Sequence, residues 1–239
     1  MGPVLVTGGS RGLGRAVVEA LAAEPGARVA FTFSTAEAAA REVEAATGAR
    51  AFRFELRDRH RADDLVTEVE EALGSLEGLV NNAGLRRESL LALTSDEDWE
   101  AVVDANLGGL FRCCRAVLRG LMVRRRGSIV NVSSLSALHG VAGQGAYAAA
   151  KAGILGLTRS LAREAGKRGV RVNAVVPGFV ATDLTAGVPA AAVERLRAGE
   201  CLPGGTSAAA VADAVLFLLS DRAAAITGQA LVVDAGASA

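Results

Sequence analysis

Short apolar runs alternate with helix-like segments along most of this chain, and that alternation is the strongest constraint on its fold. The runs are continuous in Val, Ile and Leu, as expected for strands covered on both faces. Strands of this kind joined by helices predict an α/β, doubly wound parallel sheet of the Rossmann type with helices on both faces. We expect seven strands, at residues 4–7, 28–33, 51–56, 78–81, 128–133, 170–176 and 231–233.

Helical patterns separate the expected strands. The main ones cover residues 13–23, 36–46, 61–73, 98–125, 145–166 and 208–219, with a bend expected in the fourth at Gly108-Gly109. The stretch 177–205 is irregular apart from a helical piece near 190–197. Because the chain contains no linker, low-complexity tract or repeat, we expect one domain over residues 1–239, with a substrate lid at about 184–204.

A glycine-rich turn joins the first strand to the first helix, with glycines at positions 8, 12 and 14. Gly8 would permit a tight turn, Gly12 would let the backbone approach a pyrophosphate, and Gly14 would allow close packing of the helix. Free N–H groups at the helix N-terminus favour phosphates. The turn therefore predicts a dinucleotide site.

The residues after the second strand bear on the choice of dinucleotide. An acidic residue there would bind the ribose 2′-hydroxyl of NAD, but the chain has Ser34 and Thr35 and no acid before Glu37. Arg11 could pair with a 2′-phosphate. We therefore expect NADPH/NADP+; the alternative reading of Arg11 is a solvated surface residue.

Tyr147 is the only tyrosine, and it precedes Lys151, one of only two lysines, by four residues. Residues at this spacing face each other on a helix. An ammonium beside the phenol would lower the phenol pKa from about 10 and make Tyr147 a proton donor near neutral pH. Ser134 ends the fifth strand, where its hydroxyl could hold a substrate carbonyl. The alternatives are a core tyrosine beside a surface lysine, and a serine that caps a helix or turn.

The glycine turn, Asn81-Asn82-Ala83-Gly84, Ser134, Tyr147-x-x-x-Lys151 and Pro177-Gly178 together resemble the short-chain dehydrogenase/reductase family over essentially the whole chain. Within that family, stretches such as "NNAGLRRESLL" and "GQGAYAAAKAGILGLTRSLARE" are most similar to the 3-oxoacyl-[acyl-carrier-protein] reductases.

The resemblance implies a role for each matching residue. Tyr147 would be the general acid, Lys151 would hold the nicotinamide ribose, and Ser134 would orient the carbonyl. Asn106 would support a water that relays protons to Lys151. The implied cofactor contacts are Gly8, Ser10, Arg11, Gly12, Leu13, Gly14, Ser34, Thr35, Glu55, Leu56, Asn82, Ala83, Gly84, Tyr147, Lys151, Pro177, Gly178, Val180 and Thr182.

Other positions are assigned by the same resemblance. Gln144 and His139 would lie in the substrate pocket, with a surface histidine as the alternative for His139. Arg125 and Arg168 would dock an acidic carrier protein. The chain departs from the family at Glu55, where Asp is common, and at Ala235, where a second glycine is usual.

The implied reaction is NADPH-dependent reduction of a 3-oxoacyl thioester on acyl carrier protein, in fatty acid or polyketide synthesis. One alternative is a dehydrogenase of a sugar, steroid or other free alcohol. Another is an idle NADP(H)-binding sensor or scaffold, which the complete set of Asn106, Ser134, Tyr147 and Lys151 disfavours. A homotetramer built through the long helices and the C-terminal segment is also implied.

Composition narrows the remaining classes of function. Acidic and basic residues balance at 26 each, which predicts neither nucleic-acid nor membrane binding. The three cysteines, Cys113, Cys114 and Cys201, form neither a metal-ligand spacing nor a disulfide framework. With no signal peptide or membrane-length apolar run expected, we predict a cytoplasmic protein without a metal.

Overall fold

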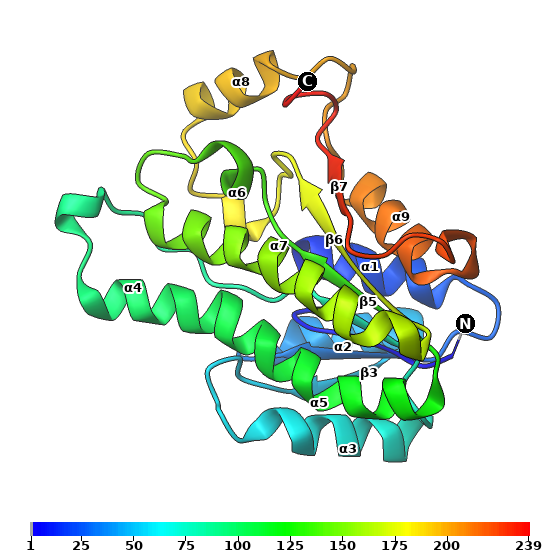
Figure 1. Cartoon of the computed structure of the whole chain (residues 1–239). Coiled ribbons are helices and arrows are strands. Elements are labelled where there is room, and N and C mark those ends of the chain that lie inside the picture. The colour runs from blue at the N-terminus through cyan, green and yellow to red at the C-terminus, as the bar shows by residue number, and fades with distance from the viewer. Residues whose placement is uncertain (1) are drawn as a thin grey trace.

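The computed structural model describes residues 2–239, with every side chain in that range except that of Leu184. Within these residues, seven parallel strands form one sheet in the order β3-β2-β1-β4-β5-β6-β7 (Figure 1). The order reverses between β1 and β4, so the sheet is doubly wound and the predicted fold class is confirmed. The strands are β1 Val4–Val6, β2 Val29–Phe33, β3 Arg50–Arg53, β4 Gly78–Asn81, β5 Gly127–Val132, β6 Val170–Pro177 and β7 Ala230–Val233.

Two helical layers cover the sheet. Alternate side chains of a strand point to opposite faces, so Val4 and Val6 join one apolar cluster and Leu5 joins the other. The first cluster lies under α1 Gly12–Ala22, α2 Glu37–Thr47 and α9 Ala208–Leu219. The second lies under α3 Arg61–Leu73, α5 Gly109–Arg124 and α7 Gly145–Ala165. Both faces are therefore buried, as the continuous apolar runs predicted.

The third strand is shorter than predicted. β3 ends at Arg53, and only one further ladder bond follows, from the Phe54 N–H to the Phe33 carbonyl at 2.8 Å. The chain then turns, because the Asp58 N–H donates to the Glu55 carbonyl at 3.0 Å. Glu55 and Leu56 consequently lie in a loop beyond the strand.

The long fourth helix is interrupted next to the two glycines, by a change of helix type that ends at Gly108. α4 Asp96–Val103 leads into a π-helical segment, Asp104–Gly108, before α5 begins. An ion pair across this segment joins the Asp104 carboxylate to the buried Arg112 guanidinium at 2.9 Å. A Cβ on Gly108 would lie 2.4 Å from the Asp104 Oδ1. Gly108 thus leaves room for the ion pair instead of acting as a hinge.

Two further α-helices lie outside the two layers. α6 Ser136–His139, which the sequence pattern did not predict, follows β5, and α8 Ala190–Ala198 lies in the predicted lid. Figure 1 shows α8 near the C-terminus, away from the sheet. The lid joins the C-terminal segment where the Cys201 and Leu202 N–H groups donate to the Ala235 carbonyl, at 2.8 and 3.0 Å. Within residues 2–239, no helix combines the length and apolar character needed to span a bilayer.

Candidate active site and cofactor groove

Three elements bring the four predicted catalytic residues together. Ser134 follows β5, Tyr147 and Lys151 lie on α7, and Asn106 lies in the π-helical segment. Tyr147 and Lys151 are 8% and 4% exposed. The Lys151 Nζ donates to the Val132 carbonyl at 2.8 Å and lies 5.6 Å from the centre of the Tyr147 ring. The helical spacing thus places the amine beside the ring and at the carboxyl end of β5.

Burial, more than the neighbouring lysine, dominates the proton affinities at this site. It raises the pKa of Tyr147 above its usual value, while a hydrogen bond with Ser134 and the positive charge of Arg86 act in the opposite direction. Burial also lowers the pKa of Lys151 to about 8. The net direction for Tyr147 is therefore opposite to the lowering expected from the sequence, because desolvation penalises the charged form of both groups.

Asn106 is fixed by its amide nitrogen. The Nδ2 donates to the Leu85 and Val102 carbonyls, at 2.7 and 2.8 Å. The buried Oδ1 has no hydrogen-bond partner among the described residues. A Cβ on Gly84 would lie 2.5 Å from this oxygen and 3.8 Å from the Lys151 Nζ. The oxygen and the amine therefore border the same space, and the oxygen is available to a water molecule there.

The glycine turn packs against the segment after β4. Gly8 and Gly12 have φ values of +69° and +55°, in the left-handed region that favours glycine. A Cβ on Gly14 would lie 2.0 Å from the Gly8 carbonyl oxygen. The Asn82 Nδ2 donates to the Thr7 and Gly8 carbonyls at 3.1 Å each, and Ala83 lies against Gly8. These contacts bring the ends of β1 and β4 together.

The N-terminus of α1 fits a pyrophosphate. No described side chain caps this helix, so its first N–H groups remain available to an anion. Arg11 is at the N-cap, and its side chain is 64% exposed and 4.0 Å from the Asp183 carboxylate. A Cβ on Gly12 would lie 3.2 Å from Thr182. Ser10 is buried within the turn, and Leu13 packs against the core.

Further contacts for a dinucleotide lie on either side of this turn. Ser34 and Thr35 are exposed after β2, and the Ser34 hydroxyl donates to the Glu55 carboxylate at 3.0 Å. Leu56 faces α5, where its carbonyl accepts from Arg112 at 2.6 Å. On the other side, Pro177 ends β6, the Gly178 N–H donates to the Val233 carbonyl at 2.9 Å, and Val180 is buried. The predicted contacts thus follow the carboxyl edge of the sheet.

The two residues predicted for the substrate pocket differ in their surroundings. Gln144 is buried, and its Oε1 accepts from the Ser136 hydroxyl at 2.7 Å while its Nε2 donates to Glu88. His139 is exposed at the end of α6. Ser136, Glu88 and its ion-pair partner Arg86 were missed because no spacing in the sequence connects the three positions; only the fold does.

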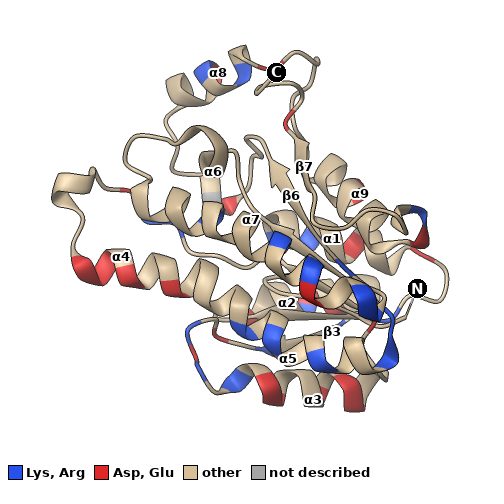
Figure 2. Cartoon of the chain, in the orientation of Figure 1, with Lys and Arg blue, Asp and Glu red and all other residues tan. Residues whose placement is uncertain are grey.

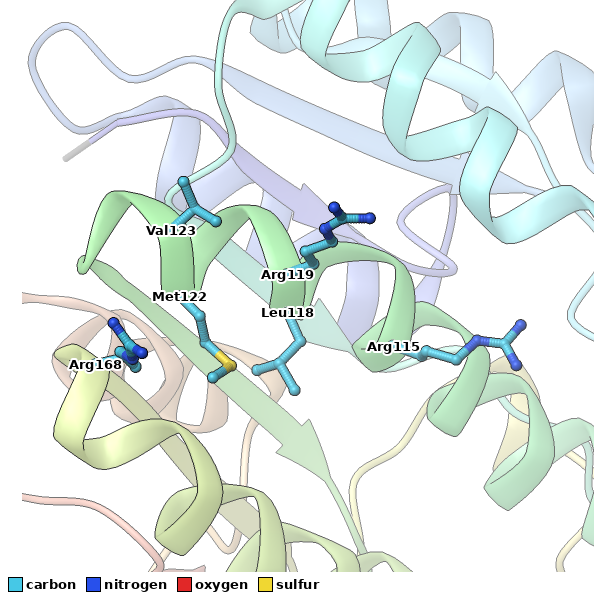
Figure 3. A pocket seen from close by; sticks show the side chains of 6 residues that line it. All are labelled: Arg115, Leu118, Arg119, Met122, Val123 and Arg168. Carbon is cyan, nitrogen blue, oxygen red and sulfur yellow. The ribbon is translucent and has the colours of Figure 1, made fainter.

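Arg125 and Arg168 lie together at the opposite edge of the sheet. Arg125 follows α5, two residues before β5, and Arg168 lies two residues before β6. The Arg125 Nη2 donates to the Lys167 carbonyl at 3.2 Å. Basic residues gather at the ends of α5 and α7 (Figure 2). Arg168 also borders a cavity of about 430 Å³ with Arg115, Leu118, Arg119, Met122 and Val123 (Figure 3). The structure therefore brings the two arginines near each other but not near Tyr147.

Comparisons with known proteins agree with this geometry. A family model described as enoyl-(acyl carrier protein) reductase matches residues 8–238. The 3-oxoacyl-[acyl-carrier-protein] reductases FabG of Chlamydia muridarum and of Escherichia coli K12 are each 41% identical to this chain over 238 residues, covering 97% of it and 95% of the relative. The FabG of Vibrio harveyi is 40% identical with the same coverage. The matching model, these relatives and the arrangement of the site lead to one assignment: the chain belongs to the short-chain dehydrogenase/reductase family.

Proposed function

We propose that this protein reduces 3-oxoacyl thioesters carried by acyl carrier protein to 3-hydroxyacyl thioesters, with NADPH, in fatty acid synthesis. The main support is the convergence of Ser134, Tyr147 and Lys151 beside a glycine turn that fits a pyrophosphate. The identity to FabG reductases over nearly the full length supports the choice of substrate. A polyketide pathway would use the same chemistry.

Several features of the groove support the choice of NADPH. The α1 N-terminus would take the pyrophosphate, while Arg11, Ser34 and Thr35 offer a cation and two hydroxyls to the 2′-phosphate. Lys151 would hold the nicotinamide ribose, and Val180 and Thr182 would adjoin the carboxamide. When bound, NADPH supplies the hydride to the substrate carbon.

Two side chains would bind the carbonyl oxygen of the substrate. Ser134 and Tyr147 would both donate hydrogen bonds to it, which stabilises the negative charge that develops during reduction. Tyr147 would transfer its proton to that oxygen, and its raised pKa keeps the phenol protonated at neutral pH. Lys151 and a water at the Asn106 Oδ1 would return a proton to the phenolate.

Tyr147→Phe tests the assignment directly. General acid catalysis contributes about 100-fold or more, so kcat for an acetoacetyl thioester should fall at least that far while NADPH affinity is kept. NADPH oxidation measures the rate, fluorescence titration measures affinity, and NADH and a panel of free ketones serve as controls. Unchanged turnover in Tyr147→Phe, or a preference for free ketones, would refute the proposal.

Carrier docking at Arg125 and Arg168 has a separate test. β5 spans about 20 Å between this edge and Ser134, so we propose that a docked carrier serves the site of a neighbouring copy in a homotetramer. Arg125→Glu and Arg168→Glu should raise KM for carrier-bound substrate and leave KM for a small thioester unchanged. Arg41→Glu, on the exposed face of α2, is the matched control.

The remaining expectations belong to the same proposal. We propose a single domain in which residues 184–204 cover the bound acyl chain. The exposed Leu196 and Leu202 support this, because a lid over an apolar substrate needs apolar side chains. A cytoplasmic location accords with a soluble carrier partner.

A further inference from the structure

A chain of hydrogen bonds leads from Ser134 to an ion pair in the loop after β4. The Ser136 N–H donates to the Ser134 Oγ at 3.2 Å, and the two hydroxyl oxygens are 3.3 Å apart. The Ser136 hydroxyl donates to the Gln144 Oε1 at 2.7 Å. The Gln144 Nε2 donates to Glu88, which pairs with Arg86 through an Nε contact of 2.9 Å.

The direction of these bonds follows from Glu88. A carboxylate only accepts hydrogen bonds, so the Gln144 amide must turn its nitrogen to Glu88 and its oxygen to Ser136. The single hydroxyl hydrogen of Ser136 is then used on Gln144. Ser136 therefore supports Ser134 through its backbone N–H, and the Ser134 hydroxyl donates to the Ser136 Oγ, a bond that it would exchange for one to a substrate carbonyl. The 3.3 Å contact between the hydroxyls is long for an O–H···O bond and easily given up.

The middle of this series of hydrogen bonds is buried, so each polar atom there needs a partner. Gln144 and Ser136 are 7% and 9% exposed, so a polar atom left without a partner there would carry a desolvation cost. The Glu88 side chain is 48% exposed and needs Arg86, itself only 16% exposed, to hold it against the amide. A separate backbone bond, from the Ser89 N–H to the Gly143 carbonyl at 2.9 Å, joins the same two loops. Removing the Glu88 carboxylate would therefore disturb the amide without separating the loops.

We propose that Glu88 is a positioning residue of the reductase, acting through Gln144 and Ser136 to hold the Ser136 N–H against Ser134. This inference rests on the proposed function, since it assumes that Ser134 binds the substrate carbonyl. Arg86 assists by fixing the Glu88 carboxylate.

A double-mutant cycle tests the pathway. One hydrogen bond contributes a factor of about three to ten, so Glu88→Ala should lower kcat by that factor, with NADPH affinity unchanged. Glu88→Gln keeps an acceptor and should recover most of the loss. Because the effect passes through the Ser136 hydroxyl, Glu88→Ala should have no further effect on kcat in a Ser136→Ala background. Asp98→Ala is the matched control, since Asp98 is 41% exposed and pairs with Arg87 outside the chain of bonds.

The outcomes separate this inference from the proposed function. If Tyr147→Phe is inactive but Glu88→Ala has wild-type kcat, or if the two losses simply add in the double variant, the positioning role is wrong. If Glu88→Ala and Asp98→Ala lower kcat equally, the effect belongs to surface charge and the inference also fails. If Tyr147→Phe keeps its activity, the proposed function itself is refuted.

Discussion

Lys151 is an amine held in a buried position that disfavours its charge. Its pKa falls from 10.5 to about 8 because burial penalises the ammonium. Between pH 8 and 10.5 the unfolded chain therefore binds a proton that the native protein has lost. Stability must then rise with pH across this window, and the burial cost is present in full below pH 8. The shift corresponds to about 3 kcal/mol.

Lys151→Met should reveal this cost. We expect the variant to have a higher free energy of unfolding than the wild type at pH 7, as measured by urea unfolding. This difference should shrink by about 2 kcal/mol between pH 7 and pH 9.5. Comparing the two proteins at each pH cancels the titration of groups that they share. An advantage that is constant with pH would show that the native lysine titrates normally.

At the scale of single residues, the sequence predicted which residues form the site but not how their surroundings affect them. Tyr147 and Lys151 were found because their helical spacing and rarity are visible in the chain. The rise in the Tyr147 pKa was not, because desolvation depends on what packs around the phenol. Likewise, Glu88 meets Gln144 only through tertiary structure, since the two positions are far apart in the sequence.

The turn after β7 contains a strained alanine. Ala235 has φ +55°, a left-handed conformation that costs a residue with a Cβ about 1 kcal/mol. Ala235→Gly should therefore raise the free energy of unfolding by about that amount. Ala237→Gly, at a position without positive φ, is the control and should destabilise slightly. An equal loss in both variants, measured by denaturant unfolding, would contradict the strain.

The π-helical segment depends on the Asp104–Arg112 pair. Asp104→Ala would leave the buried Arg112 guanidinium without its carboxylate, so we expect a loss of about 3 kcal/mol. Glu19→Ala breaks an exposed pair with Arg15 and should cost less than about 1 kcal/mol. Because Asn106 lies within the segment, kcat should also fall in Asp104→Ala alone. Equal stability losses in the two variants would show that the pair does not hold the segment.

The elements themselves were largely predictable, and the two main exceptions have separate causes. Apolar runs placed the strands within a few residues, because the central strands β1, β2, β4, β5 and β6 are buried on both faces. The edge strands β3 and β7 are partly exposed. The π-helical segment was predicted as a glycine bend. The sequence pattern did not indicate the buried ion pair that spans the segment, because the pair joins Asp104 to Arg112, two helical turns later. α6 was missed because four residues carry too little periodicity to predict a helix.

At the scale of the whole molecule, two apolar surfaces support self-association. A groove of about 760 Å³ runs between α4, α5 and α7, where Trp99 and Phe111 are 39% and 46% exposed. The second surface is β7, at the edge of the sheet, where Leu231 and Val232 are each 37% exposed. Exposed apolar patches and open strand edges of this kind mark contact surfaces. Two independent surfaces are what a tetramer with twofold symmetry requires.

The two surfaces should therefore act as separate interfaces. Phe111→Asp places a charge in the groove and should reduce a tetramer to dimers, because burying an unpaired carboxylate is costly. Adding Leu231→Asp should give monomers, as measured by sedimentation velocity. Val123→Asp, at a residue that is 76% exposed outside both surfaces, should remain tetrameric. If the wild type sediments as a monomer, or if Phe111→Asp stays tetrameric, the groove is not an interface. The cavity bordered by Arg168 would then lack the neighbouring copy that carrier docking requires.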